Sequence, residues 1–115
     1  MGLDQYVYVI NPDPQEPSAE LFYWRKHPDL QRFMEQKYYE RGGTATEFNT
    51  EEVTVDDDVL DSLELAMRTN TLPQNEGGFF FGMSMYEDTE QTWIFLRKAR
   101  AALAEGKQLI YTSWW

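Results

Sequence analysis

Residues 5–10, Gln-Tyr-Val-Tyr-Val-Ile, restrict the fold more than any other segment of this sequence. β-Branched and aromatic side chains fill both sets of alternate positions, a pattern typical of a strand that is covered on both faces. A strand of this kind lies in the interior of a sheet. We therefore expect residues 5–10 to form a central strand.

Apolar periodicity predicts the other elements. Helical spacing predicts helices that begin at Pro28, after the capping box Thr54-Val-Asp-Asp57, and at about Asp88. Their expected ends are Gly42-Gly43, a point before Pro73, and Gly106. The further strands predicted are residues 20–24, 48–55, 77–82 and 108–114. We expect a single α+β domain over residues 1–115, with a mixed or antiparallel sheet and about three helices packed on one face.

Composition excludes several classes of protein. The chain has 115 residues and no cysteine, which excludes a disulfide scaffold and a zinc-thiolate site. No apolar run approaches the roughly 20 residues that span a membrane. The start, Met1-Gly-Leu-Asp4, lacks the features of a secretion signal. We therefore expect a cytoplasmic protein that does not bind membranes.

The charge is unevenly distributed. The net charge of -10 argues against direct binding to nucleic acid. Residues 47–66 carry eight acids and no base, whereas residues 21–46 carry five bases and three acids. The locally basic segment leaves room for a small anionic ligand.

Catalytic residue types are scarce. His27, the only histidine, precedes Pro28 at a helix entrance, which is more typical of a surface or capping group than of a base. There is no Gly-x-Ser-x-Gly motif for a serine hydrolase. The adjacent acids at 56–58 would point about 100° apart on a helix, so they cannot converge on one metal ion. We expect no enzymatic activity, no metal site and no cofactor.

The sequence Tyr23-Trp-Arg-Lys26 combines two aromatic rings with a guanidinium and an ammonium. Such a group can stack a nucleobase and hold a phosphate. In the alternative, Trp24 or Tyr23 packs in the core while Arg25 and Lys26 neutralise nearby acids. The glycines at 77 and 78 would let a ligand approach the backbone closely. The candidate ligand-binding residues are Tyr23, Trp24, Arg25, Lys26, Gly77, Gly78 and Ser113.

The acidic block at residues 47–64 also has two interpretations. It can be the solvated side of a strand and a helix, with Val59, Leu60 and Leu63 turned inward. A dense run of carboxylates can instead imitate nucleic acid and occupy a basic groove on another protein. The candidate protein-interaction residues are Asp56, Asp57, Asp58 and Asp61.

Six short motifs are spread along nearly the whole chain: Met1-Gly-Leu-Asp-Gln-Tyr-Val-Tyr8, Tyr23-Trp-Arg-Lys26, Pro73, Gly78-Phe-Phe-Phe-Gly82, Tyr86-Glu87 and Tyr111-Thr-Ser-Trp114. In order and spacing this set resembles a widespread family of small, mostly uncharacterised bacteriophage proteins. The chain departs from the family at Gln5, usually Met, and at Thr112, commonly Ser. It also lacks the longer insert that many relatives carry after the first strand. The resemblance implies an accessory protein that acts in the cytoplasm of the infected bacterium.

Small accessory phage proteins often counter host antiviral systems, which suggests two functions. In the first, the chain sequesters a nucleotide-like immune signal in an aromatic pocket with Arg25 and Lys26, without catalysis. In the second, it is an acidic inhibitor that docks on a basic nucleic-acid-binding surface of a host defence or transcription protein. The aromatic terminus Trp114-Trp115 would also permit a homo-oligomer.

Overall fold

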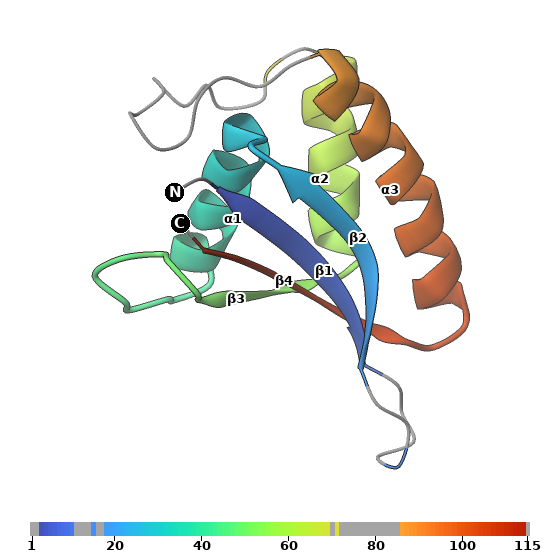
Figure 1. Cartoon of the computed structure of the whole chain (residues 1–115), viewed down its shortest axis with the longest axis horizontal. Coiled ribbons are helices and arrows are strands. Elements are labelled where there is room, and N and C mark those ends of the chain that lie inside the picture. The colour runs from blue at the N-terminus through green and yellow to red at the C-terminus, as the bar shows by residue number, and fades with distance from the viewer. Residues whose placement is uncertain (1–2, 11–14, 16–17, 70, 72–85, 115) are drawn as a thin grey trace.

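The computed structural model describes residues 3–10, 15, 18–69, 71 and 86–114, with the side chains of residues 86–88 left out. Seven elements follow one another along the chain: β1 (Asp4–Ile10), β2 (Ala19–Arg25), α1 (Pro28–Glu40), β3 (Glu52–Val55), α2 (Asp57–Arg68), α3 (Tyr86–Ala104) and β4 (Gln108–Trp114). Figure 1 shows them as one compact unit. The predicted strand at residues 77–82 lies outside the described residues.

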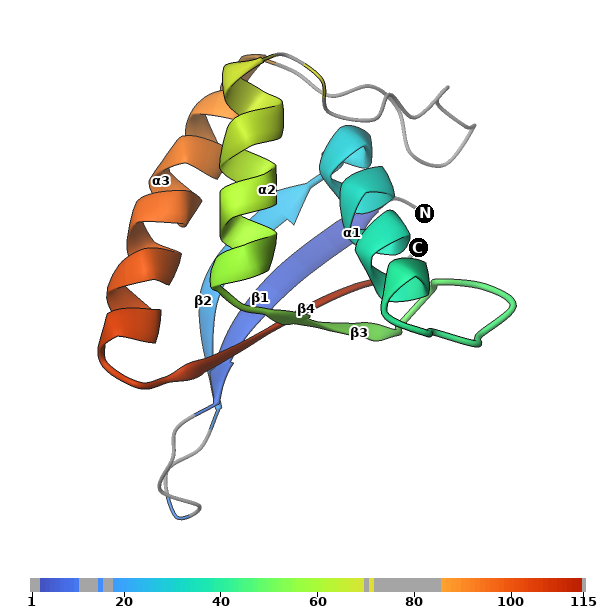
Figure 2. The same ribbon diagram turned by 180° about the vertical axis from the view of Figure 1, so that it is seen from behind.

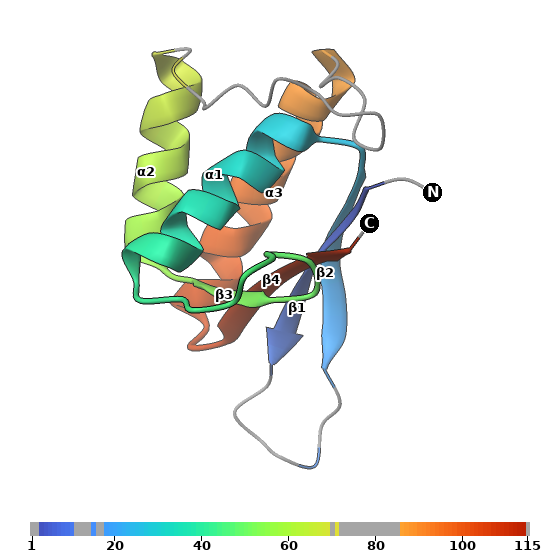
Figure 3. The ribbon, with the colours of Figure 1, turned by 90° about the vertical axis from the view of Figure 1, so that its left-hand side faces the viewer.

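The four described strands form one antiparallel sheet in the order β2-β1-β4-β3. β1 is an interior strand, as its composition predicts, and it pairs with β4 over its whole length, from Asp4 opposite Trp114 to Ile10 opposite Gln108. A bulge near Tyr8 interrupts its pairing with β2. All three helices lie on the same side of the sheet (Figures 2 and 3). The prediction of an α+β domain is confirmed.

The core lies between the helices and one face of the sheet. β1 contributes Gln5, Val7 and Val9 to this side, while the side chains that alternate with them point away from the helices. Trp24 of β2 is fully buried and packs against Phe95 of α3, with ring centroids 4.8 Å apart. Its indole N–H donates to the hydroxyl of Thr92. This layer of apolar contacts holds the sheet against the helices.

The expectation that β1 is covered on both faces was wrong for the described part of the chain. Tyr6 and Tyr8 alternate with the core residues, and their side chains are only half-buried on the side opposite the helices. Tyrosine satisfies the strand propensity while its hydroxyl stays in water. The residue types therefore look like those of a strand buried on both faces.

The start of α2 also differs from the prediction. Asp56, not Thr54, is the N-cap, and its carboxylate accepts from the backbone N–H of Val59 at 3.0 Å. Thr54 remains in β3, which is shorter than predicted because Thr50 has a positive φ of 67°. α3 ends as predicted, since the N–H of Gly106 donates to Leu103 and its φ is 82°.

Among the residues described, no helix has the length and apolar character needed to cross a membrane.

Candidate functional site

The face of the sheet that points away from the helices carries a row of exposed and half-buried aromatic side chains. We call it the open face, because among the described residues no helix lies on it (Figure 3). Tyr6 stacks along β1 with Tyr8, with ring centroids 5.7 Å apart and an interplanar angle of 18°. The ring of Tyr23 on β2 lies 5.0 Å from that of Tyr6. Trp114 of β4 is 56% exposed.

A recess of about 310 Å³ opens on this face between β1, β4 and the turn before β3. We call it the aromatic recess, and its lining residues are Tyr6, Tyr8, Thr50, Thr112, Ser113 and Trp114. Cross-strand pairing places Thr112 beside Tyr6. The left-handed backbone of Thr50 lets its N–H donate to the carbonyl of Ser113 at 2.7 Å, which holds the turn against the end of β4. The recess has the size of a small-ligand or single-side-chain site.

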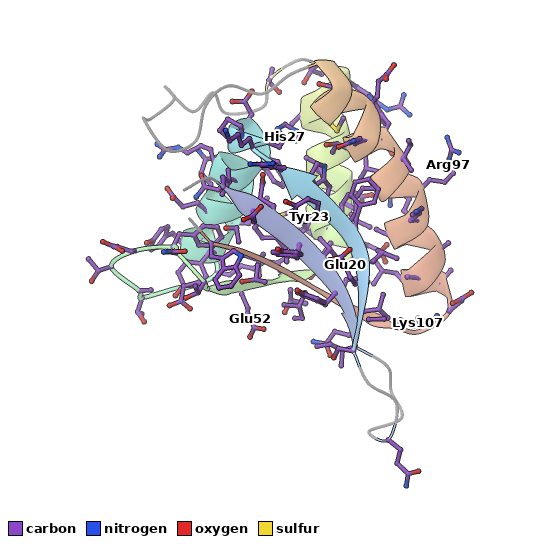
Figure 4. The ribbon with its side chains drawn as sticks, viewed as in Figure 1. Glu20, Tyr23, His27, Glu52, Arg97 and Lys107 are labelled. Atoms are coloured by element: carbon purple, nitrogen blue, oxygen red, sulfur yellow. The ribbon has the colours of Figure 1, made fainter. Side chains whose placement is uncertain are left out.

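Acidic side chains outnumber basic ones around the recess. By strand alternation and register, Asp4, Glu20 and Glu52 lie on the open face. The strand residues described there include one base, Arg25, which is paired in register with Asp4. Figure 4 marks Glu20 on β2 and Glu52 on β3, the two edge strands. The open face therefore favours positively charged ligands.

The carboxylates of this face contribute to raised pKa values of two tyrosine hydroxyls. Tyr23 donates a hydrogen bond to Asp4 at 2.5 Å, and this bond, with burial and the charge of Asp4, raises the pKa of Tyr23 to about 12. Burial raises the pKa of Tyr8 as well, with smaller contributions from Tyr6 and from Glu20. Both side chains therefore stay neutral hydroxyls at physiological pH and can donate or accept hydrogen bonds.

The structure divides the predicted ligand-binding cluster between the two faces. Tyr23 and Arg25 are exposed on the open face, whereas Trp24 is fully buried among the helices. Lys26 follows the strand in a left-handed conformation with φ 62°, and its side chain is exposed. Adjacent strand residues alternate between faces, so Trp24 cannot share a cavity with its neighbours. Trp24 takes the core position that the alternative interpretation allowed.

The remaining members of that cluster are also accounted for. Ser113 borders the aromatic recess, but it is only 1% exposed and its hydroxyl lies on the helix side of β4 with Tyr111. Gly77 and Gly78 lie outside the described residues. The residues brought together on the open face are thus Tyr23 and Arg25, with the recess beside them.

The predicted protein-interaction acids are mostly engaged within the chain. Arg41 binds Asp56 at 2.9 Å and reaches Asp58 at 3.6 Å. Arg100 binds Asp61 at 2.9 Å. Although partial burial acts in the opposite direction, the bonds from Arg41 and the backbone of Val59 lower the pKa of Asp56. These acids therefore cap α2 and tie it to α1 and α3.

The inward positions of the same helix behave as expected. Val59, Leu60 and Leu63 are all fully buried. Asp57 is exposed, and no group of three potential ligands that could hold a metal ion occurs among the residues described.

His27 was expected to be a surface or capping group, and it is the N-cap residue of α1, but it is buried and its side chain makes no capping hydrogen bond. It is 1% exposed, and burial lowers its pKa to about 4. Its backbone N–H donates to the side-chain oxygen of Gln5 at 2.8 Å, and the amide nitrogen of Gln5 lies within hydrogen-bond distance of the His27 carbonyl and of the Tyr111 hydroxyl. Burial raises the pKa of Tyr111. This enclosed cluster links the start of α1 to the centre of the sheet, which is a structural role.

Sequence reasoning missed Tyr6, Tyr8, Thr50 and Thr112 as site residues, and it connected Trp114 only with a homo-oligomer. A signal was present in part: the Tyr-x-Tyr spacing in β1 places two rings on one face. The contribution of Thr50 had no sequence signal, because it depends on the turn that brings this residue to the end of β4.

Comparisons with protein-family models, with curated proteins and with solved structures found no match for this chain.

Proposed function

We propose that this chain is a non-catalytic binding protein that docks on a basic surface of another protein through its open face. The observation that carries the proposal is the combination, on a sheet face that no described helix covers, of an aromatic recess with three carboxylates and one guanidinium. Tyrosine and tryptophan supply contact area at protein interfaces together with a polar group. The excess of carboxylates selects a partner of opposite charge.

This proposal keeps the acidic-inhibitor hypothesis but moves the docking surface. The acids of α2 already bind Arg41 and Arg100, so their attraction for a partner is reduced. Glu20 and Glu52 stand on the two edge strands of the open face, and within the described part of the chain neither forms an ion pair (Figure 4). In the setting that the family resemblance implies, the partner is a host defence or transcription protein whose nucleic-acid-binding surface becomes blocked.

A second candidate is capture of a nucleotide-like ligand on the same face. Its support is the proximity of Tyr23 and Tyr6, whose rings could stack a base beside the guanidinium of Arg25. The carboxylates of Asp4 and Glu20 oppose it, since they would repel a phosphate. We therefore rank nucleotide capture below protein docking as a function of this face.

Selection from a randomised peptide library on the purified protein tests the docking proposal. We expect enrichment of peptides rich in lysine and arginine, with affinity that falls about tenfold or more between low and moderate salt. Thr112→Arg places a positive charge in the open face and should abolish binding. Leu65→Arg, at a 62% exposed position on α2, is the matched control and should bind like the wild type.

Two results would overturn the proposal. One is enrichment of peptides without basic residues, and the other is equal binding by the Thr112→Arg variant. Thermal-shift measurements with mononucleotides and cyclic dinucleotides test the second candidate, because stabilisation that Arg25→Ala removes would favour nucleotide capture.

A further inference from the structure

The aromatic recess combines features that suit one particular side chain. Its wall along β1 is formed by the nearly parallel rings of Tyr6 and Tyr8, and Trp114 adds an exposed indole at the end of β4. The faces of such rings carry negative potential and attract cations, tryptophan most strongly. A planar cation that enters the recess can stack on one of these rings while its N–H groups face the polar lining residues.

The polar groups of the recess are acceptors as well as donors. Thr50 and Thr112 contribute hydroxyls, each with lone pairs that can accept a hydrogen bond. Glu52 is paired in register with Thr112, so it is the β3 neighbour of this recess residue, although it does not itself line the recess. A guanidinium has five N–H donors, enough to bond a carboxylate and neighbouring hydroxyls together.

The charges around the recess disfavour a negatively charged ligand. Asp4 is paired in register with Trp114, and Glu20 with Tyr8, so acidic side chains also adjoin the β1 and β2 side. The one base among the strand residues described for this face, Arg25, is a register partner of Asp4, which lies between Arg25 and Trp114 across the strands. An anion in the recess would meet mainly like charge.

We propose that the aromatic recess is a subsite for one arginine side chain of the bound partner. This inference rests on the proposed docking function and names the residue that anchors it. Arginine fits better than lysine because its guanidinium is planar, weakly hydrated and able to stack on aromatic rings, whereas an ammonium is strongly hydrated. The recess of about 310 Å³ accommodates one such side chain and not a folded segment.

An NMR titration with Nα-acetyl-arginine amide tests the subsite directly. We expect shifts at the backbone amides of Tyr6, Tyr8 and Thr112 and at the indole N–H of Trp114. Nα-acetyl-citrulline amide has the same shape without the charge, and its affinity should be about tenfold lower. Nα-acetyl-lysine amide should bind about threefold more weakly than the arginine compound.

Two variants measure the contributions of the Trp114 ring and of the Glu52 carboxylate to arginine binding separately. Trp114→Leu should reduce arginine affinity about fivefold by removing the best cation–π partner. Glu52→Gln should reduce it about threefold and leave the citrulline affinity unchanged. Tyr39→Leu removes a ring that is 41% exposed on α1, and this control should bind arginine like the wild type.

The subsite is overturned if citrulline binds as tightly as arginine, if the shifts fall outside the recess, or if Trp114→Leu has no effect. Arginine binding equal to lysine binding would overturn the choice of arginine. If basic peptides bind the open face without shifts in the recess, the subsite fails while the docking function stands. If the arginine compound binds but no basic peptide is selected, the subsite stands and the docking function fails.

Discussion

The helix-covered face of the sheet holds a buried cluster of hydrogen-bonded polar groups, whereas the open face carries exposed and half-buried aromatic rings. Gln5 and Tyr6 are neighbours in β1 and illustrate the difference. Gln5 is fully buried and binds His27 and Tyr111, while Tyr6 borders the recess. The same strands thus contribute a bonded core on one face and exposed rings on the other.

The largest difference is expected between two tryptophans. Trp24→Ala removes a fully buried indole that packs 4.7 Å from Phe22 and 4.8 Å from Phe95, and it should lower the free energy of unfolding by about 3–5 kcal/mol. Trp114→Ala, on the open face, should change it by less than about 0.5 kcal/mol. Urea denaturation of the two variants measures both values. Equal losses would mean that the open face contributes to stability as the core does.

The next effect is a pH dependence that arises on the helix-covered side. Burial lowers the pKa of His27 from 6.5 to about 4, so the unfolded chain binds a proton more tightly than the folded one. The titration of His27 does not affect the free energy of unfolding above pH 6.5, the pKa in the unfolded chain. As the pH falls from 6.5 to about 4, it lowers the free energy of unfolding by about 3 kcal/mol. Denaturation midpoints over this range measure it.

His27→Gln is the control for this measurement. It removes the titrating ring, so the fall in stability between pH 6.5 and pH 4 should become shallower than in the wild type. An unchanged pH profile would assign the loss to the carboxylates instead.

A smaller loss of stability is expected when the side-chain amide of Gln5 in β1 is removed. Gln5→Leu deletes the hydrogen bonds to the His27 backbone and the Tyr111 hydroxyl, and it should cost about 2–3 kcal/mol because these groups are buried. Tyr8→Phe, which changes a hydroxyl of the open face, should cost less than about 0.5 kcal/mol. Thermal unfolding compares the pair. A neutral Gln5→Leu variant would show that apolar packing replaces the cluster at no cost.

The smallest predicted difference concerns carboxylates. Asp56→Ala removes the N-cap of α2 and the ion pair with Arg41, and it should destabilise the chain by about 1–2 kcal/mol. Glu52→Ala on the open face should have an effect below about 0.5 kcal/mol. Chemical denaturation at neutral pH is the measurement. A larger effect of Glu52→Ala would mean that this carboxylate serves the fold.

Local patterns predicted most of the fold, because periodicity and capping depend on near neighbours. The helix at Pro28 and the stop at Gly106 follow from such signals. The cap at Asp56 was misplaced by two residues, since both Thr54 and Asp56 can accept a hydrogen bond from a helix start. The local sequence does not say which of the two is still paired in a strand.

The site was harder to predict because it depends on pairing between distant residues. The faces of Tyr23 and Trp24 follow from strand alternation alone, so the division of that cluster was available from the sequence. The contact of Thr50 with Ser113 was not, since it arises only when β3 and β4 pair. Likewise, the arginines that neutralise the acids of α2 lie on α1's end and on α3.

The pairing of β1 with β4 joins residues from opposite ends of the described sequence, as in Gln5 opposite Ser113. During synthesis on a ribosome, β1 emerges first and must wait for β4 before its second edge is satisfied. Until then it can form only the local hairpin with β2, and its other row of backbone groups stays open to strands of other chains. Newly made chains thus pass through a stage that is prone to aggregation, and slower synthesis would lengthen it.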